Sequence, residues 1–453
     1  MPRAWTSIAA TGLLLGGLAV GLVWGHPRSA VDWQRGRAVV LASDDWGLCG
    51  FLPDSAAIAH LDREALAPGQ IPDAYWHTTL EDSAMVAALG AVLQRHRGRD
   101  GLTAVLQPNY IMASLAYVPA TADSLPRWIE QALPAVPPGY ERPGLWRAVQ
   151  DLQRAGLWHP ELHGRWHYDP RLRQARTAAA PPVQAAAARQ ILAFPDCDTA
   201  WELGSWRDLA LIEDELRYNL EQFGALFGGL PRSVIAPDYY WNDAHEQLWI
   251  AHGLRVIQGQ RQQRQSAWRG WRGRVSKVGH RVWTRWWRSD RVYIDRNCLF
   301  EPVLPLPEPA HAARAYREVT GAWARHEPAV VQAHRINFVH LDAAVRRLGL
   351  LELERLLSHV TAERPVFLVD GELAALSRRG TSWVVRGDAL VVRNLTRARR
   401  LVVVPEQALR TLASQRDTAA QGIPQRSLLL TLAPGESRVL HATPLLRRQD
   451  QDR

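Results

Sequence analysis

Short apolar runs alternate with helix-like segments over roughly 340 residues, and this order constrains the fold of the chain most strongly. The first run, Ala38 to Ala42, is short and apolar enough for a buried parallel strand. Similar runs follow at 102–106, 233–236, 255–257, 330–333 and 366–369, with helix-like segments at 82–97, 206–227 and 341–361. Strands interleaved with helices predict an α/β fold with a mostly parallel sheet, and a (β/α) barrel is the commonest closed form at this size. No GxGxxG or GxxxxGK[ST] motif follows a run, which argues against an open nucleotide-binding sheet.

After Gly380 the pattern changes to short strands separated by turn residues, which predicts a small all-β unit. The expected organisation is therefore a targeting segment at 1–30, the barrel at 31–378, a small β-sandwich-like domain at 381–446 and a charged tail at 447–453.

The N-terminal segment from Ile8 to Trp24 is apolar and follows a single basic residue, Arg3, as in export signals. Its length lies between that of a signal peptide and that of a spanning helix, and an uncleaved signal anchor is favoured over a cleaved signal. The bulk of the chain is then expected outside the cytoplasm, membrane-anchored or secreted, facing the periplasm or the extracellular side. The three cysteines are widely separated and support neither a disulfide framework nor a zinc site.

The formal charge of +9 is concentrated between Arg261 and Arg291, where ten basic residues face one acidic residue and five tryptophans are interleaved. Such a stretch suits a membrane interface, stacking on sugar rings or an anionic polymer. Nucleic acid fits the same composition but is the less expected partner of an exported protein. The alternative is a loop whose tryptophans pack on the barrel.

Two adjacent carboxylates, Asp44 and Asp45, follow the first strand, at the end where barrel strands deliver catalytic groups. Adjacent carboxylates repel each other unless a positive charge neutralises them. A bound cation is the economical solution, with one Asp as a ligand and the other accepting a proton from water. A solvated turn in which Asp caps a helix is the alternative.

A second cluster contains His163 and His167, four positions apart. On a helical turn this spacing would place both imidazoles on one side, where they could chelate one divalent ion. Two neutral His and one carboxylate leave positions open for water and substrate, as in catalytic zinc sites. The spacing also arises by chance in a chain with sixteen His.

Taken together, these motifs resemble those of the polysaccharide deacetylase superfamily of carbohydrate esterases, whose domain is a deformed (β/α) barrel. Residues 43–47, Ser-Asp-Asp-Trp-Gly, are similar to the family's T-F-D-D-G motif, and residues 163–167, His-Gly-Arg-Trp-His, to its H-[ST]-x-x-[HND] motif. The resemblance implies that Asp44 is the general base and that Asp45, His163 and His167 bind the metal.

Later motifs of the family match less well. Residues 234–241 are similar to its third motif, but the Arg that would position the base is missing. Residues 331–334 are similar to its fifth motif, which makes His334 the candidate general acid, with Asp295 orienting it; a buried hydrogen-bonded role for His334 is the alternative. Loops after expected strands supply the candidate substrate contacts, namely Asp238, Tyr239, Trp241, Arg296, Asn297, Glu301, His77 and Asn109.

The expected activity is removal of N- or O-acetyl groups from an extracytoplasmic polysaccharide by a metal-dependent hydrolase. Zinc suits a His/His/Asp set, and cobalt, nickel or manganese would also be accepted. Two other functions remain open: a metal-independent glycoside hydrolase on the same barrel, and a non-catalytic glycan-binding protein of polysaccharide assembly or export.

Overall fold

A curled, parallel sheet forms the centre of the computed structural model, which describes residues 29–66, 72–179, 181–191, 209–265, 270–287, 289–306, 309, 311–414 and 427–441. The sheet has nine strands in the order β8-β7-β6-β5-β2-β1-β10-β9, and β11 pairs with β1 beside β2. The strands are β1 (Ala38–Trp46), β2 (Leu106–Ile111), β5 (Glu161–Gly164), β6 (Ser233–Val234), β7 (Val256–Gln258), β8 (Val292–Ile294), β9 (Cys298–Leu299), β10 (Ala329–His334) and β11 (Val366–Leu368). All the pairings are parallel, so the carboxyl ends of the strands lie at one edge.

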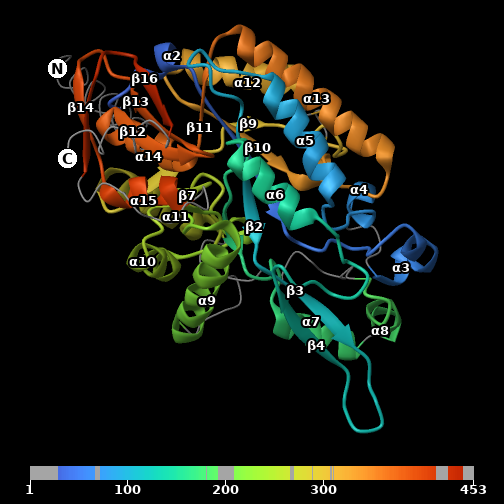
Figure 1. Cartoon of the computed structure of the whole chain (residues 1–453). Helices are drawn as coiled ribbons and strands as arrows, with labels where there is room; N and C mark the ends of the chain where they lie inside the picture. The colour runs from blue at the N-terminus through green and yellow to red at the C-terminus, as the bar shows by residue number, and fades with distance from the viewer. Residues whose placement is uncertain are drawn as a thin grey trace, which may run out of the picture.

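Helices cover the outer face of the sheet, with α5, α12 and α13 side by side on one flank and α9, α10 and α11 on the other (Figure 1). Their apolar faces close the main core, in which Leu89, Val319 and Leu357 are completely buried. The helices are α2 (Trp33–Gly36), α3 (Arg63–Leu66), α4 (Asp73–Trp76), α5 (Ser83–Arg95), α6 (Leu145–Arg154), α7 (Pro170–Ala179), α8 (Pro181–Ala187), α9 (Leu209–Phe227), α10 (Asp243–Ala251), α11 (Gly270–Trp287), α12 (Ala312–Ala324), α13 (Ala343–Ala362), α14 (Asp370–Arg379) and α15 (Glu406–Ser414).

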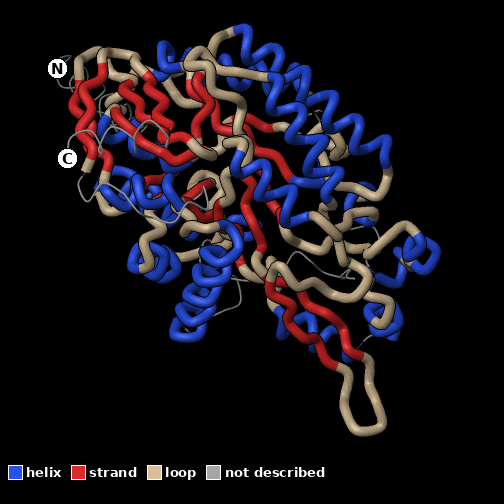
Figure 2. Tube along the Cα trace, in the orientation of Figure 1, coloured by secondary structure: helices blue, strands red, loops and turns tan. Residues whose placement is uncertain are grey.

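A two-stranded hairpin of β3 (Ala113–Val118) and β4 (Arg127–Ala132) projects from the body of the molecule, as the tube in Figure 2 shows. This hairpin was not predicted from the sequence. It follows β2 directly and leaves the sheet at the carboxyl edge, so it adds a wall on the side where the candidate site lies.

The segment after Gly380 forms two small antiparallel sheets and α15. One contains β12 (Thr381–Arg386), β13 (Ala389–Asn394) and β16 (Ser437–His441), and the other β14 (Arg400–Val404) and β15 (Leu428–Leu432). Arg393 of β13 is completely buried and ion-paired to Asp100 and, at 2.9 Å, to Glu372 of α14. This segment is therefore tied to the barrel by buried charges.

The sequence predicted an α/β fold with a parallel sheet followed by a small all-β unit. The parallel sheet and the small β-sheets after it are confirmed, whereas helix α15 shows that the later unit is not all-β. The sheet is curled but open: β8 and β9 are not paired with each other in the described part of the chain. No helix within the described ranges is long and apolar enough to cross a membrane. The expected targeting segment at 1–30 lies almost wholly outside those ranges, as do the whole tail at 447–453 and parts of the 261–291 stretch.

Candidate active site

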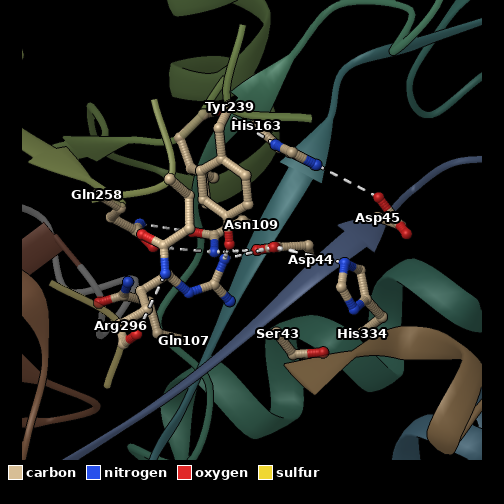
Figure 3. A network of polar contacts seen from close by, with 12 residues as sticks. Ser43, Asp44, Asp45, Gln107, Asn109, His163, Tyr239, Gln258, Arg296 and His334 are labelled. Atoms are coloured by element: carbon tan, nitrogen blue, oxygen red, sulfur yellow. Dashed lines mark hydrogen bonds and ion pairs between the residues drawn. The ribbon is translucent and has the colours of Figure 1, made fainter. Parts of the chain in front are cut away.

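The carboxyl end of β1 carries Asp44 and Asp45 with different surroundings. Asp44 is buried and its side chain lies among Arg296, Asn109 and His334, whereas Asp45 is half-buried and faces His163; both line the same cavity (Figure 3). The backbone at Asp45 has a φ of +71°, a conformation that Asp tolerates better than most residues, and the pairing of β1 with β2 is irregular here. The two carboxylates are thus separated in direction although they are adjacent in sequence.

Asp45 is joined by the two histidines that the sequence placed with it. Its Oδ1 atom lies 3.3 Å from Nε2 of His163 and 3.2 Å from Nε2 of His167. Ligand atoms of a tetrahedral zinc site lie about 3.3 Å apart, because each bond is about 2.0 to 2.1 Å long. The separations therefore suit a divalent ion bound by one carboxylate and two imidazoles, the set that the structure brings together.

The histidine pair is not on a helix, so the helical-turn expectation was wrong. His163 is the penultimate residue of β5, and His167 lies in the bend that follows, with a φ of +68°. Nδ1 of His163 lies 3.0 Å from the carbonyl oxygen of Ile235. A proton on Nδ1 satisfies that carbonyl and leaves the Nε2 lone pair facing Asp45, as a metal ligand requires.

Asp44 is held by donors from the neighbouring strand β2 and from the loop between β8 and β9 (Figure 3). Nη1 of Arg296 donates to Oδ2 at 2.5 Å, and Nδ2 of Asn109 donates to Oδ1 at 2.7 Å. Gln258 in turn donates to Oδ1 of Asn109 at 3.0 Å. Burial opposes the charged form of Asp44, but the neighbouring positive charge, chiefly of Arg296, keeps the pKa of Asp44 below its usual value. The Arg that the third motif lacks was expected to position the carboxylate of Asp44, and Arg296 makes that contact instead.

His334 ends β10 and lies on the other side of Asp44. Its Nε2 atom is 3.9 Å from Oδ2 of Asp44, and its Nδ1 atom is 2.6 Å from Oε1 of Glu301. Asn337 holds Glu301 by donating to Oε2 at 2.8 Å. Although burial disfavours the charged imidazole, the carboxylate of Glu301 raises the pKa of His334 to about 10.

Asp295 does not orient His334, contrary to the sequence prediction. Its carboxylate lies 2.8 Å from Nε of Arg261 and belongs to a different ion-pair cluster. The orienting carboxylate is that of Glu301, which the sequence placed among the substrate contacts.

A cavity of about 340 Å³ opens above these groups. Asp238 and Tyr239 line it, with φ values of +47° and +57°. Backbone strain of this kind persists where the surrounding structure imposes it, often at functional sites. Four aromatic side chains that the sequence did not single out also line it: Phe51, Tyr75, Trp166 and Tyr168.

Several predicted substrate contacts lie outside this cavity. Trp241 is buried and donates to Glu246 at 2.8 Å, and Asn297 donates to the carbonyl of Pro328 at 3.0 Å. His77 lies 2.9 Å from a guanidinium nitrogen of Arg63. These three side chains bond to other parts of the protein and do not face the cavity. Asn109 donates its hydrogen bond to Asp44.

Comparisons with known proteins find similarity in structure only. No protein-family model matches the sequence, and no curated protein matches it significantly. The chain is similar to the Xyl-CE4 domain of a multidomain xylanase from the hindgut metagenome of Trinervitermes trinervoides, with 9% identity, a TM-score of 0.31 and coverage of 73% of this chain and 86% of that one. The catalytic domain of a peptidoglycan N-acetylglucosamine deacetylase from Eubacterium rectale has 12% identity, a TM-score of 0.29 and coverage of 73% and 87%.

A β-L-arabinopyranosidase from Geobacillus stearothermophilus matches at a comparable level, with 11% identity, a TM-score of 0.30 and coverage of 90% and 97%. Solved deacetylase domains and glycoside hydrolases are therefore both among the structures that this chain resembles. At TM-scores below 0.5 these likenesses do not separate one activity from the other, and the geometry of the site has to do so.

Proposed function

We propose that the protein is a metal-dependent hydrolase that removes acetyl groups from an extracytoplasmic polysaccharide. The observation that carries this proposal is the convergence of Asp45, His163 and His167, with donor atoms 3.2 to 3.3 Å from Oδ1 of Asp45, directly beside a buried, charged Asp44. Such a set leaves coordination positions open for water and for a substrate oxygen. A divalent ion bound there would polarise the acetyl carbonyl and lower the pKa of water, and zinc, cobalt, nickel and manganese all accept these ligands.

Two residues beside the ion-binding set are suited to the two proton transfers of the reaction, one as acceptor and the other as donor. Asp44 is charged at neutral pH, so it is able to accept the proton of the attacking water. Arg296 and Asn109 fix its carboxylate by two hydrogen bonds and keep it from rotating. His334 is protonated at neutral pH, because of Glu301, and is able to give its proton to the departing amine or alkoxide.

This arrangement supports the deacetylase over the glycoside hydrolase. A glycosidase needs two carboxyl groups facing the scissile bond from opposite sides. Glu301 is buried and engaged by His334 and Asn337, and Asp238 is ion-paired to Arg264 at 2.7 Å. Neither is a second carboxylate placed for that reaction. The extracytoplasmic setting rests on the apolar N-terminal sequence.

Metal content of the purified full-length chain tests the proposal without knowledge of the substrate. We expect about one equivalent of divalent metal per chain after dialysis. Asp45→Asn and His167→Ala should lose it, whereas Asp123→Asn and His60→Ala, at exposed positions outside the ion-binding set and the cavity, should retain it. A wild-type protein that holds no metal after reloading with zinc contradicts the proposal.

Acetate release then tests the reaction itself. The loaded enzyme should liberate acetate from acetylated glycans, and the Asp45→Asn variant should not. Reducing ends without acetate, unaffected by a chelator, would instead identify a glycosidase.

A further inference from the structure

A second, larger hollow lies at the opposite end of the sheet from the candidate active site. It has a volume of about 800 Å³ and is lined by residues at the amino ends of β6, β7 and β8 together with residues of α14 and β12. The candidate active site uses the carboxyl ends of β1, β5 and β10, so the two hollows are separated by the length of the strands. We call the second hollow the arginine groove.

The charged side chains that line this groove are all basic, although carboxylates outside the lining, those of Glu161, Glu372 and Asp290, also act on its arginines. Its lining contains five arginines and no Asp or Glu among the described residues: Arg232, Arg255, Arg378, Arg379 and Arg386. The side chains of Arg255 and Arg379 have no hydrogen-bond or ion-pair partner in the described part of the chain, and both are exposed. Like charges at this density repel one another and raise the local potential, which an anion would relieve.

Arg386 makes the groove more than an exposed patch. It is 6% exposed and donates to the carbonyl oxygens of Thr103 and Gly156 at 2.9 and 3.1 Å. No carboxylate pairs with it within the described ranges, and its Nε atom has no partner. Its Nη1 atom also donates to the carbonyl oxygen of Phe367 at 3.4 Å, and the charges of Glu372 and Asp100 act on it without forming an ion pair. An anion in the groove would add compensation for this buried guanidinium. Burial, together with the charges of Arg232 and Arg386, also lowers the pKa of the adjacent His159 to about 3, so that this residue stays neutral.

Apolar surface lies between the cations. Trp383 is half-buried in the wall, with the guanidinium of Arg232 4.6 Å from its ring centre, and Leu230 is 65% exposed at the rim. Free phosphate would use neither the aromatic wall nor a hollow of this size, which falls in the range of sites for extended ligands. Carboxylates match guanidinium forks, and the C–H faces of sugar rings match a tryptophan ring.

We propose that the arginine groove binds a segment of acidic polysaccharide, with its carboxylates on the arginines and its sugar rings against the apolar wall. This site is separate from the ion-binding residues and does not rest on the activity proposed above. It would hold one part of a polymer while another part is at the opposite end of the sheet.

Titration calorimetry of the full-length protein in detergent, with a galacturonic acid hexamer as the probe, tests the proposal. Arg255→Gln/Arg379→Gln removes two exposed, unpaired charges of the groove, and Arg317→Gln/Arg347→Gln removes two exposed charges on α12 and α13. We expect the groove variant to bind the hexamer about tenfold or more weakly, the control variant to bind as the wild type does, and added salt to weaken binding.

Four results would overturn the proposal. The wild type could fail to bind the hexamer, or the groove variant could bind it as tightly as the wild type does. The wild type could also bind neutral maltohexaose as tightly as the galacturonic acid hexamer. In the fourth result, inorganic phosphate or a short DNA strand binds more tightly than the hexamer and depends on the same arginines. Metal content, measured on the same samples, is expected to be equal in all variants, so that the two proposals fail independently.

Discussion

Replacing Arg296 by Met should leave the buried carboxylate of Asp44 without its ion-pair partner. Arg296 is 4% exposed, its guanidinium lies 2.5 Å from Oδ2 of Asp44, and Met fills much of the same space without the charge. Asp44 is itself 3% exposed, and the remaining hydrogen bond from Asn109 is neutral. Arg296→Met therefore keeps the shape of the site and removes the nearest positive charge, while the imidazole of His334 remains 3.9 Å from the carboxylate.

The magnitude follows from the burial of both partners. Removing one member of a buried ion pair typically destabilises a protein by about 3 to 5 kcal/mol, because the other charge is left uncompensated. The pKa of Asp44 is lowered in the native state, so this stabilisation is present above the unfolded value of 3.8 and is lost as pH falls through the folded value. The deficit of Arg296→Met should accordingly be largest at neutral pH and shrink below about pH 4.

Urea unfolding followed by tryptophan fluorescence at pH 7 and at pH 3.5 measures the deficit. Asp44→Asn/Arg296→Met is the matched control, because with both charges gone it should regain a large part of the lost stability. Where acetate release is measurable, the acidic limb of the activity profile of Arg296→Met should move to higher pH. Equal unfolding midpoints for wild type and Arg296→Met at pH 7 would refute the reasoning.

The remaining predictions concern Glu301 and a tightly packed glycine. Glu301→Gln should lower the pKa of His334 from about 10, so the alkaline limb of the activity profile, where His334 loses its proton, moves to lower pH, whereas Asp295→Asn should leave that limb in place. An unshifted limb in Glu301→Gln would show that Glu301 does not set the protonation of His334. Gly349→Ala should destabilise the protein by about 1 to 3 kcal/mol or more in urea unfolding, because the added Cβ would lie 1.6 Å from a backbone carbonyl oxygen. Gly279→Ala, which meets nothing within 4 Å on helix α11, should instead stabilise by about 0.5 to 1 kcal/mol, and equal midpoints for the two variants would contradict the packing argument.

Site residues that lie close together in the sequence could be identified from the sequence alone. Asp44 and Asp45 follow the first buried strand directly, and His163 and His167 are only four positions apart, so a short pattern is enough to pair them. The same pattern gave the wrong local structure for the histidines, because a strand end and a bend with positive φ place two imidazoles together as well as a helical turn does.

Hydrogen-bond and ion-pair partners that are distant in the sequence were harder to identify. Arg296 reaches Asp44 from 252 positions away, and nothing in its own neighbourhood indicates which carboxylate it meets. Asp295 and Glu301 lie on either side of the short strand β9 in a polar stretch before His334, and only the path of the chain decides that Glu301 faces the imidazole. The hairpin of β3 and β4 was missed because β4 mixes charged and polar residues with apolar ones and is not an uninterrupted apolar run like the main strands.

The pairing of β1 has a consequence for how the protein is made. Strand β1 is synthesised before the other strands of the sheet. It cannot pair with β10 and β11 until roughly 300 more residues have been synthesised. Arg393, which neutralises two acidic groups of the barrel, comes later still. An apolar first strand without its neighbours is prone to aggregation during that delay. Synthesis of this chain should therefore depend on chaperones that shield β1, and shortening it before Arg393 should yield insoluble protein.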